Sequence, residues 1–235
     1  MSDFNTILSG LSGRFIAFEG ADGSGKSTQL RRFVDAARAA GVAVCEVREP
    51  GGTPIGEEIR RILLHTKDEM SLRCEMLLYM ASRAQLVDTR IRPAIAAGEL
   101  VIADRFVSST IAYQGAAGGL PLGEINAVAQ AATSGCMPEL VLIFDVDQST
   151  AARRTRGVET TSKRRGPAVK GAATTTLFDD RIERRDSDFH ARVREGYLAQ
   201  AKADPARHLV IDASGEPDRV WQLLQAAIVG WQGLR

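Results

Sequence analysis

Short apolar runs alternate along the chain with longer segments in which apolar residues recur at helical spacing. Five of these runs have the character of buried strands, and they cover residues 15–18, 42–44, 100–103, 140–144 and 208–211. The stretches between them are long enough to hold a helix, so each can cross over between parallel strands. The pattern therefore predicts an α/β fold in which helices flank both faces of a five-stranded parallel sheet.

Two stretches depart from this alternation. Residues 153–170 are rich in Arg and Lys, interleaved with Gly, Thr, Ala and Pro, and they show no hydrophobic period. Such a stretch inside a compact domain is either a mobile lid or a disordered basic loop. Residues 1–13 contain several small and turn-forming residues, and we expect an N-terminal tail there. We therefore predict a single domain over residues 14–235, with a lid at about 151–185.

Composition limits the possible classes of function. The 235 residues are 44% hydrophobic and 25% charged, as in one ordinary globular domain. The formal net charge of +1 gives no overall attraction to nucleic acid or membranes, so we expect neither as a partner. Every apolar run is too short to span a membrane and residues 1–13 lack a basic leader pattern, so we expect a cytoplasmic protein. The three cysteines show no metal-binding spacing, and we assign them no role.

The first predicted strand is followed by a glycine-rich segment that fits the pattern G-x-x-x-x-G-K-[ST]. Its members are Gly20, Ala21, Asp22, Gly23, Ser24, Gly25, Lys26 and Ser27. A helical pattern begins directly afterwards, which is the context that a phosphate-binding loop requires. Backbone N–H groups would surround the phosphates, Lys26 would reach the β- and γ-phosphates, and Ser27 would bind Mg²⁺. A plain glycine-rich turn does not explain the closing Lys-Ser pair. We therefore predict a site for ATP and Mg²⁺.

The loop alone does not separate a kinase from a GTPase or a motor ATPase, but six further motifs do. They are Phe18-Glu19-Gly20, Arg48-Glu49-Pro50-Gly51-Gly52-Thr53, Tyr79-Met80-Ala81-Ser82-Arg83, Asp104-Arg105-Phe106, Tyr113-Gln114-Gly115 and Asp180-Arg181-Ile182-Glu183. In this order and approximate spacing, the chain resembles the bacterial thymidylate kinases. The resemblance runs from about residue 14 to the C-terminal helix and is interrupted by the basic segment. It implies a P-loop kinase fold with a lid, phosphoryl transfer from ATP to dTMP, and a homodimer.

The resemblance also implies an acceptor site. Its members would be Arg48, Tyr79, Arg83, Asp104, Arg105, Thr110, Tyr113 and Gln114. The planar fork of Arg105 is suited to grip the acceptor phosphate, although it could instead pair structurally with Asp104. Tyr79 and Arg83 are four residues apart on one helical face and would stack on the pyrimidine and donate to a base carbonyl. Taken without the resemblance, Tyr79 is better explained as a core aromatic residue in a mostly apolar helix. Tyr113 would pack under the sugar and exclude a 2′-hydroxyl, which favours deoxyribose.

The remaining charges are assigned less directly. Asp22 matches an acid that contacts the acceptor 3′-hydroxyl and the Mg²⁺ shell in the family, but many phosphate loops tolerate any residue there. Asp104 could hold Mg²⁺ through water. Some family members place a basic residue in the loop where this chain has Ser24, so here the catalytic positive charge must come from the lid.

The lid contains several candidates for that charge. Arg154 and Arg156 match the R-x-R-G motif at the lid entry, and Arg181 lies in the exit motif. The insert at residues 157–177 is longer than expected for the family, and which lid arginine is catalytic stays open. Its basic cluster at 163–165 either contacts ATP or stays solvated.

Three other functions compete with this interpretation. The chain could be a P-loop kinase for another monophosphate or a small acceptor. It could bind nucleic acid through the basic insert, or it could bind a nucleotide without catalysis. For the kinase we expect in-line attack by the acceptor phosphate, which needs no general base because that oxygen is already nucleophilic at neutral pH.

Overall fold

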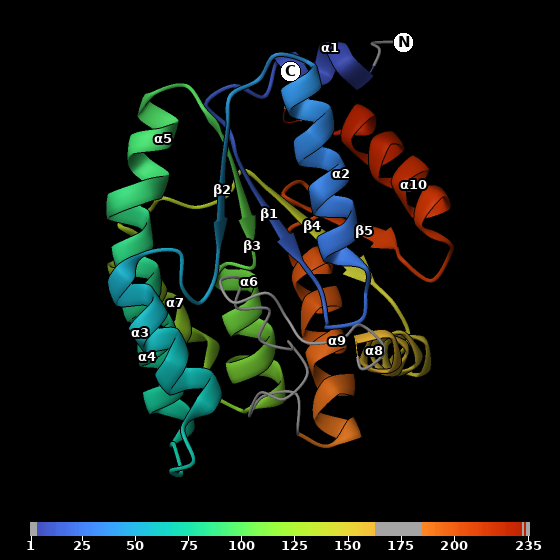
Figure 1. Ribbon diagram of the computed structural model, residues 1–235. Coiled ribbons are helices and arrows are strands. Elements are labelled where there is room, and N and C mark those ends of the chain that lie inside the picture. Colours follow the sequence, from blue (N-terminus) through green and yellow to red (C-terminus); the bar gives the residue numbers. More distant parts are fainter. Residues whose placement is uncertain (1–3, 163–184, 232, 234–235) are drawn as a thin grey trace.

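The computed structural model describes residues 4–162, 185–231 and 233 (Figure 1). Five strands form one sheet in the order β2-β3-β1-β4-β5, and all neighbouring strands are parallel. The strands are β1 (Phe15–Glu19), β2 (Val44–Arg48), β3 (Leu100–Asp104), β4 (Leu140–Asp145) and β5 (His208–Asp212). The predicted five-stranded parallel sheet is therefore confirmed.

Helices fill the connections, as the hydrophobic pattern indicated. They are α1 (Phe4–Ser9), α2 (Lys26–Ala39), α3 (Pro54–His65), α4 (Leu72–Leu86), α5 (Arg92–Ala96), α6 (Val107–Thr110), α7 (Leu122–Thr133), α8 (Gln148–Ser162), α9 (Ser187–Ala203) and α10 (Pro217–Gly230). Two π-helical segments, η1 (Val87–Ile91) and η2 (Ile111–Ala117), continue α4 and α6. No helix in the described part of the chain is both long and apolar enough to cross a membrane.

The central strand β1 divides its side chains between two cores. Phe15 and Ala17 face the layer that includes α4, η2, α7 and α9, whereas Ile16 and Phe18 face the layer of α1, α2 and α10. Figure 1 shows α1, α2 and α10 together on one side of the sheet. Successive strand residues point to opposite faces, so an uninterrupted apolar run can bury both faces of a sheet. This arrangement explains why β1, with every residue buried, shows no polar alternation.

The parallel register brings the carboxyl ends of the strands to one edge of the sheet. Phe18 of β1 lies opposite Asp104 of β3, and Asp104 lies opposite Arg48 of β2. The segments that follow these strands therefore start side by side. Ligands of open α/β sheets bind beyond this edge, and the predicted phosphate loop and Arg105 both lie there.

Strand β2 and the N-terminal segment differ from the sequence predictions. The run expected at residues 42–44 is replaced by a strand at Val44–Arg48, an edge strand in which buried Cys45 and Val47 alternate with more exposed residues. Such alternation shortens the apolar run that marks a strand. Part of the expected tail forms α1, which is held in place because Leu8 within it and Leu11 just after it are fully buried.

The basic stretch also begins differently. Helix α8 continues to Ser162, through the first part of the stretch that showed no hydrophobic period. Asp147 lies directly before this helix, and its carboxylate accepts hydrogen bonds from the Ser149 hydroxyl and from the Thr150 N–H at 2.9 Å. These bonds, that of Ser149 first, lower the pKa of Asp147 below its usual range. Capping of this kind helps to start a helix whose interior has no apolar face. The rest of the stretch, residues 163–170, lies outside the described residues.

Candidate active site

The glycines of the phosphate loop adopt backbone conformations that other residues rarely reach. Gly20, Gly23 and Gly25 have φ values of 140°, 78° and 82°. A Cβ atom at Gly20 would lie 2.6 Å from the carbonyl oxygen of Phe144, and one at Gly23 would lie 2.4 Å from that of Ala151. The loop is therefore pressed against the end of β4 and the first turn of α8. Substitution at either glycine would displace it.

The same loop leads directly into the N-terminus of α2. Gly25 is the N-cap residue, and no side chain caps the helix there. The first N–H groups of a helix are left without intrahelical partners and favour an anion. Ser24 Oγ is buried and has no hydrogen-bond partner among the described residues. Both observations fit a loop that binds phosphate groups.

Lys26 lies at the centre of this edge and is almost completely buried, with 6% of its surface exposed. Its Nζ atom contacts the carboxylate of Asp104 at the end of β3. Burial lowers the pKa of Lys26 to about 7; the positive charge of Arg105 acts in the same direction, while Asp22 and Glu19 oppose it. Phosphate groups bound beside Lys26 would raise its pKa again and restore the positive charge of the amine.

Ser27 and two acids form the part of the site that suits Mg²⁺. Ser27 is exposed on the first turn of α2, and the carboxylates of Asp22 and Asp104 are contacted by Arg105 and Lys26, respectively. Among the residues that the structure describes, no group of three or more His, Cys, Asp and Glu side chains could hold a metal ion. Mg²⁺ commonly binds through one or two protein oxygens together with waters and substrate phosphates, and this donor set fits that mode.

Arg105 connects the phosphate loop to the rest of the site. Its Nη2 atom lies 2.5 Å from Asp22 Oδ1, within the loop. Its Nη1 atom donates to Ser109 Oγ at 3.2 Å and to the Tyr197 hydroxyl at 3.3 Å. The guanidinium also lies over the ring of Tyr113, with its carbon 5.4 Å from the ring centroid. The alternative pairing with Asp104 is not what the structure shows, since Asp104 contacts Lys26 instead.

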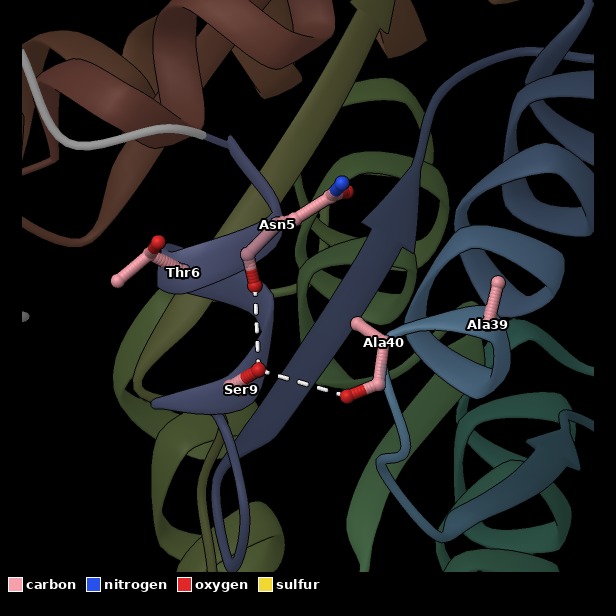
Figure 2. Close-up of a pocket in the computed structure, with 5 residues that line it drawn as sticks. All are labelled: Asn5, Thr6, Ser9, Ala39 and Ala40. Atoms are coloured by element: carbon pink, nitrogen blue, oxygen red, sulfur yellow. Dashed lines mark hydrogen bonds between the residues drawn. The ribbon is translucent and has the colours of Figure 1, made fainter.

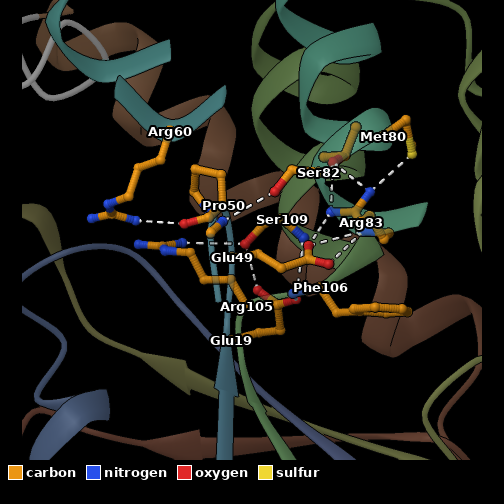
Figure 3. A network of polar contacts seen from close by, with 12 residues as sticks. Glu19, Glu49, Pro50, Arg60, Met80, Ser82, Arg83, Arg105, Phe106 and Ser109 are labelled. Carbon is orange, nitrogen blue, oxygen red and sulfur yellow. Dashed lines mark hydrogen bonds and ion pairs between the residues drawn. The ribbon is translucent and has the colours of Figure 1, made fainter. Parts of the chain in front are cut away.

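The turn that carries Arg105 is held by Glu19, the last residue of β1. Arg105 has a positive φ of 72°, a conformation that costs energy for a residue other than glycine. Glu19 Oε1 accepts the N–H groups of Phe106 at 2.7 Å and Ser109 at 3.3 Å, and Oε2 accepts the Ser109 hydroxyl at 2.6 Å (Figure 3). Oε2 also accepts the Tyr197 hydroxyl at 3.0 Å. The carboxylate is fully buried. Glu19 thus compensates for the strain at Arg105.

Arg83 forms a second buried network beside the first. Its Nε and Nη2 atoms donate to the Glu49 carboxylate, with Nη2 only 2.5 Å from Oε2 (Figure 3). Nη1 and Nη2 both lie 3.2 Å from Thr110 Oγ1. Its side chain is 1% exposed and that of Glu49 is 3% exposed. Burial raises the pKa of Glu49 to about 7, against the opposing charge of Arg83. The guanidinium of Arg83 is thus already bonded to protein groups. Its predicted contact with a base stays a prediction.

The π-helical segment η2 presents the next two predicted acceptor residues. Tyr113 is 6% exposed, and its ring packs against those of Phe189 and Tyr197 with centroids 6.2 and 6.4 Å apart. Gln114 Nε2 donates to Glu75 Oε1 at 2.7 Å. π-Helical turns frequently occur at functional sites. The structure thus brings Tyr113 next to Arg105, whereas the amide of Gln114 points to a buried glutamate.

Tyr79 and Arg48 lie farther toward the rim of the site. Tyr79 is partly buried on α4, one helical turn before Arg83, and packs against the core of this layer. Arg48, at the end of β2, pairs with Glu57 at 2.8 Å and is half exposed. Glu57 also accepts the N–H of Gly52 at 2.8 Å, so this pair orders the turn after β2. Their predicted roles stay predictions.

The lid arginines fall partly outside what the structure describes. Arg154, on α8, donates to three carbonyl oxygens after β5, those of Ala213, Ser214 and Gly215, at 2.8 to 3.0 Å. It runs past the phosphate loop, since a Cβ at Gly25 would lie 3.9 Å from its Nη1. Arg156 belongs to α8, but its side chain lies outside the described part, and Arg181 lies wholly outside it.

Sequence reasoning missed several polar residues that hold the site together. Three of them lie outside every recognised motif, namely Glu75, Ser109 and Tyr197. Glu19 belongs to the motif Phe18-Glu19-Gly20, but the motif assigns it no role of its own. A carboxylate that ends a central parallel strand is a signal that could have been used, because such ends border the ligand site. No comparable signal marks Tyr197, whose pattern is that of a core aromatic in an amphipathic helix.

A separate hollow of about 390 Å³ lies between α1 and the end of α2 (Figure 2). Its lining is made of Asn5, Thr6, Ser9, Ala39 and Ala40. Ser9 Oγ donates to the backbone oxygens of Asn5 at 3.2 Å and Ala40 at 3.4 Å. The lining includes no ionisable side chain, and it lies away from the carboxyl ends of the strands. We assign it no part in the chemistry.

Comparison with known proteins agrees with the motifs. The family model described as thymidylate kinase matches residues 18–223. A thymidylate kinase of Solidesulfovibrio magneticus is 45% identical over 210 residues, which cover 88% of this chain and 94% of that protein. Thymidylate kinases of Leifsonia xyli subsp. xyli and Deinococcus radiodurans are 44% and 41% identical, over 86% and 92% of this chain and 88% and 96% of their own lengths.

Proposed function

Because the chain belongs to the thymidylate kinase family, we propose that it transfers the γ-phosphoryl group of ATP to dTMP, giving dTDP and ADP. The observation that supports this most directly is the ion pair between Arg105 and Asp22, 2.5 Å long. An arginine suited to grip an acceptor phosphate is thereby held against the loop that would bind the donor phosphates. Phosphoryl transfer depends mainly on such alignment.

On the donor side, the phosphates of ATP would lie at the N-terminus of α2, within the loop of residues 20–27. Lys26 would exchange its contact with Asp104 for phosphate oxygens, whose negative charge would raise its pKa from about 7. Ser27, Asp22 and Asp104 are the residues that would hold Mg²⁺. When bound, the ion neutralises the charge on the transferred group.

On the acceptor side, Arg105 would bind the phosphate of dTMP and Tyr113 would pack against the sugar. Tyr113 is 6% exposed and fixed between Arg105 and the rings of Phe189 and Tyr197, so it has little freedom to move aside. A ribose 2′-hydroxyl buried against it without a partner would cost about 1–3 kcal/mol. That cost would favour deoxyribose by roughly ten- to a hundredfold.

Phosphoryl transfer also benefits from a positive charge beside the transferring group. Ser24 supplies none, so an arginine of the lid has to provide it. Arg154 is the candidate with a described side chain, and it passes beside Gly25 of the loop. Arg156 and Arg181 stay candidates from the resemblance. The attacking oxygen belongs to the acceptor phosphate, and no general base is required.

A coupled assay of ADP formation tests the proposal with purified protein, Mg·ATP and a panel of acceptors. We expect dTMP to have the highest kcat/KM, above dUMP, dCMP, UMP and CMP. A monophosphate turned over much faster than dTMP would replace it as the acceptor, and no turnover with any acceptor would leave only nucleotide binding. Tyr113→Ala should raise the relative rate with UMP over dUMP.

The expected homodimer and cytoplasmic location belong to the proposal as well. Exposed apolar side chains on α3 and α4 are compatible with a pairing surface, namely Ile55, Ile62 and Leu77 with exposures of 57%, 38% and 48%. Light scattering coupled to size-exclusion chromatography would decide between one chain and two.

A further inference from the structure

Two hydroxyl groups lie between the carboxylate of Glu19 and the guanidinium of Arg105. Arg105 Nη1 lies 3.2 Å from Ser109 Oγ and 3.3 Å from the Tyr197 hydroxyl. On their other side, Glu19 Oε2 lies 2.6 Å from Ser109 Oγ (Figure 3). The same oxygen lies 3.0 Å from the Tyr197 hydroxyl. The two hydroxyl oxygens are 2.9 Å apart. Each hydroxyl can donate to the carboxylate and accept from the arginine at the same time.

We propose that Ser109 and Tyr197 are positioning residues that hold the guanidinium of Arg105 for the acceptor phosphate, with Glu19 as their common anchor. The inference rests on the proposed function, in which Arg105 binds that phosphate. Neither hydroxyl needs to touch the acceptor, because each acts through Arg105.

Glu19 is well suited to be the anchor. It ends the central strand β1, its carboxylate is fully buried, and backbone N–H groups of Phe106 and Ser109 fix one of its oxygens. Hydrogen bonds to a buried ionised carboxylate are strong and short. The position of this carboxylate is therefore set by the backbone of two adjacent segments, β1 and the turn into α6.

The state of the Tyr197 hydroxyl agrees with this arrangement. Burial raises its pKa well above the usual range, and the negative charge of Glu19 raises it further. The phenol therefore keeps its proton, which it can donate to Glu19 while its oxygen accepts from Arg105. Tyr197 belongs to α9, so the helix that follows the lid region takes part in placing the acceptor arginine.

Arg105 needs such support because an arginine side chain has many rotamers. Ordering a flexible side chain at the moment of binding lowers affinity, whereas an arginine ordered in advance avoids that cost. Here Asp22 holds Nη2, the two hydroxyls hold Nη1, and the ring of Tyr113 covers one face. Contacts from three segments, the phosphate loop, the continuous helix α6–η2 and α9, thus define the plane of the guanidinium.

The test compares the binding of dTMP with that of thymidine, which lacks the phosphate. The measured quantity is the ratio of the thymidine Kd to the dTMP Kd, determined by calorimetry. Arg105→Met should lower this ratio most strongly, because the phosphate of dTMP would then add little to binding. Tyr197→Phe and Ser109→Ala should each lower it about tenfold, as expected for the loss of a hydrogen bond to a charged group. Thymidine binding should stay within about twofold of the unmodified protein.

Ser108→Ala is the matched control. Ser108 is the neighbouring residue on α6 and is also buried, but its described hydrogen bond is through its backbone oxygen, to Gln200 Nε2 at 3.2 Å. This variant should leave the ratio unchanged. In the Arg105→Met background, Tyr197→Phe should have no further effect on dTMP binding, because the hydroxyl would have lost the group through which it acts.

The outcomes separate this inference from the function on which it rests. If Arg105→Met leaves the ratio unchanged, the proposed role of Arg105 fails, and the inference with it. If Arg105→Met lowers the ratio but Tyr197→Phe and Ser109→Ala do not, the inference alone is overturned. Equal losses for thymidine and dTMP, or additivity with Arg105→Met, would also overturn it. If Tyr197→Phe does not fold, the Ser109→Ala result decides.

Discussion

Arg83 provides the sharpest test of the site, because the structure and the family resemblance suggest different tasks for it. The substitution is Arg83→Met, which keeps most of the side-chain volume and removes the charge. It would leave the carboxylate of Glu49 buried, with 3% of its side chain exposed. Removing one partner of a buried ion pair costs about 3–5 kcal/mol. For a chain of this size, that loss lowers Tm by roughly 6–20 °C.

The pH dependence gives the prediction a second, independent readout. Glu49 has a pKa of about 7 in the folded protein, against an ordinary value of 4.5. The folded state therefore holds a proton that the unfolded state has released, so this group makes stability fall as pH rises from 4.5 to 7. Without Arg83 the pKa of Glu49 should rise further. The destabilisation by Arg83→Met should thus be smallest near pH 5 and largest above pH 7.

The assay is urea unfolding followed by circular dichroism at several pH values, together with the KM for dTMP. The matched control is Arg73→Met, on the same helix, whose ion pair with Glu124 is 61% and 44% exposed. It should cost less than about 1 kcal/mol. The double variant Glu49→Gln, Arg83→Met should be more stable than Arg83→Met alone. If Arg83→Met costs no more than the control while the KM for dTMP rises, Arg83 binds the base and our reasoning is refuted.

Three further predictions follow from other features of the structure. Lys26, with a pKa of about 7, is mostly neutral at pH 8, so the binding of Mg·ATP should take up nearly one proton at that pH. Calorimetry in two buffers of different ionisation enthalpy measures this uptake, and the variant Lys26→Arg should show none. Gly23→Ala should abolish measurable ATP binding without unfolding the protein, because the new Cβ would lie 2.4 Å from the carbonyl oxygen of Ala151. Retained affinity in a binding titration would contradict the described loop. Leu11→Ala should cost about 2–5 kcal/mol in urea unfolding because Leu11 is fully buried; a cost near zero would mean that the N-terminal segment does not pack as described.

The sequence predicted the features that depend on local pattern. The sheet followed from five apolar runs with helix-length spacers, and the phosphate loop followed from its glycines and its place between a strand and a helix. Because parallel strands end at one edge, the sequence also placed Asp104 and Arg105 beside that loop. The structure agrees, with Arg105 joined to Asp22.

Features that depend on long-range pairing could not be predicted in this way. Glu19 and Tyr197 share a hydrogen bond although they are 178 residues apart in the chain. Helical spacing placed Tyr79 and Arg83 on one face of a helix, but nothing in that spacing showed that Glu49 would hold the guanidinium. The start of the chain was missed for a related reason: Leu8 and Leu11 are too few to form a recognisable period, and their burial depends on packing against distant elements.

The division of the two cores by the sheet also separates the protein's natural chromophores. Both tryptophans, Trp221 and Trp231, pack in the layer of α1, α2 and α10, where the ring of Phe4 meets that of Trp221 at 5.7 Å. All three tyrosines, Tyr79, Tyr113 and Tyr197, lie in the layer on the other face. Tryptophan emission should therefore report the integrity of the α10 layer and change little when an acceptor binds. The acceptor side carries tyrosines and no tryptophan, so tryptophan emission follows one face of the sheet separately from the other.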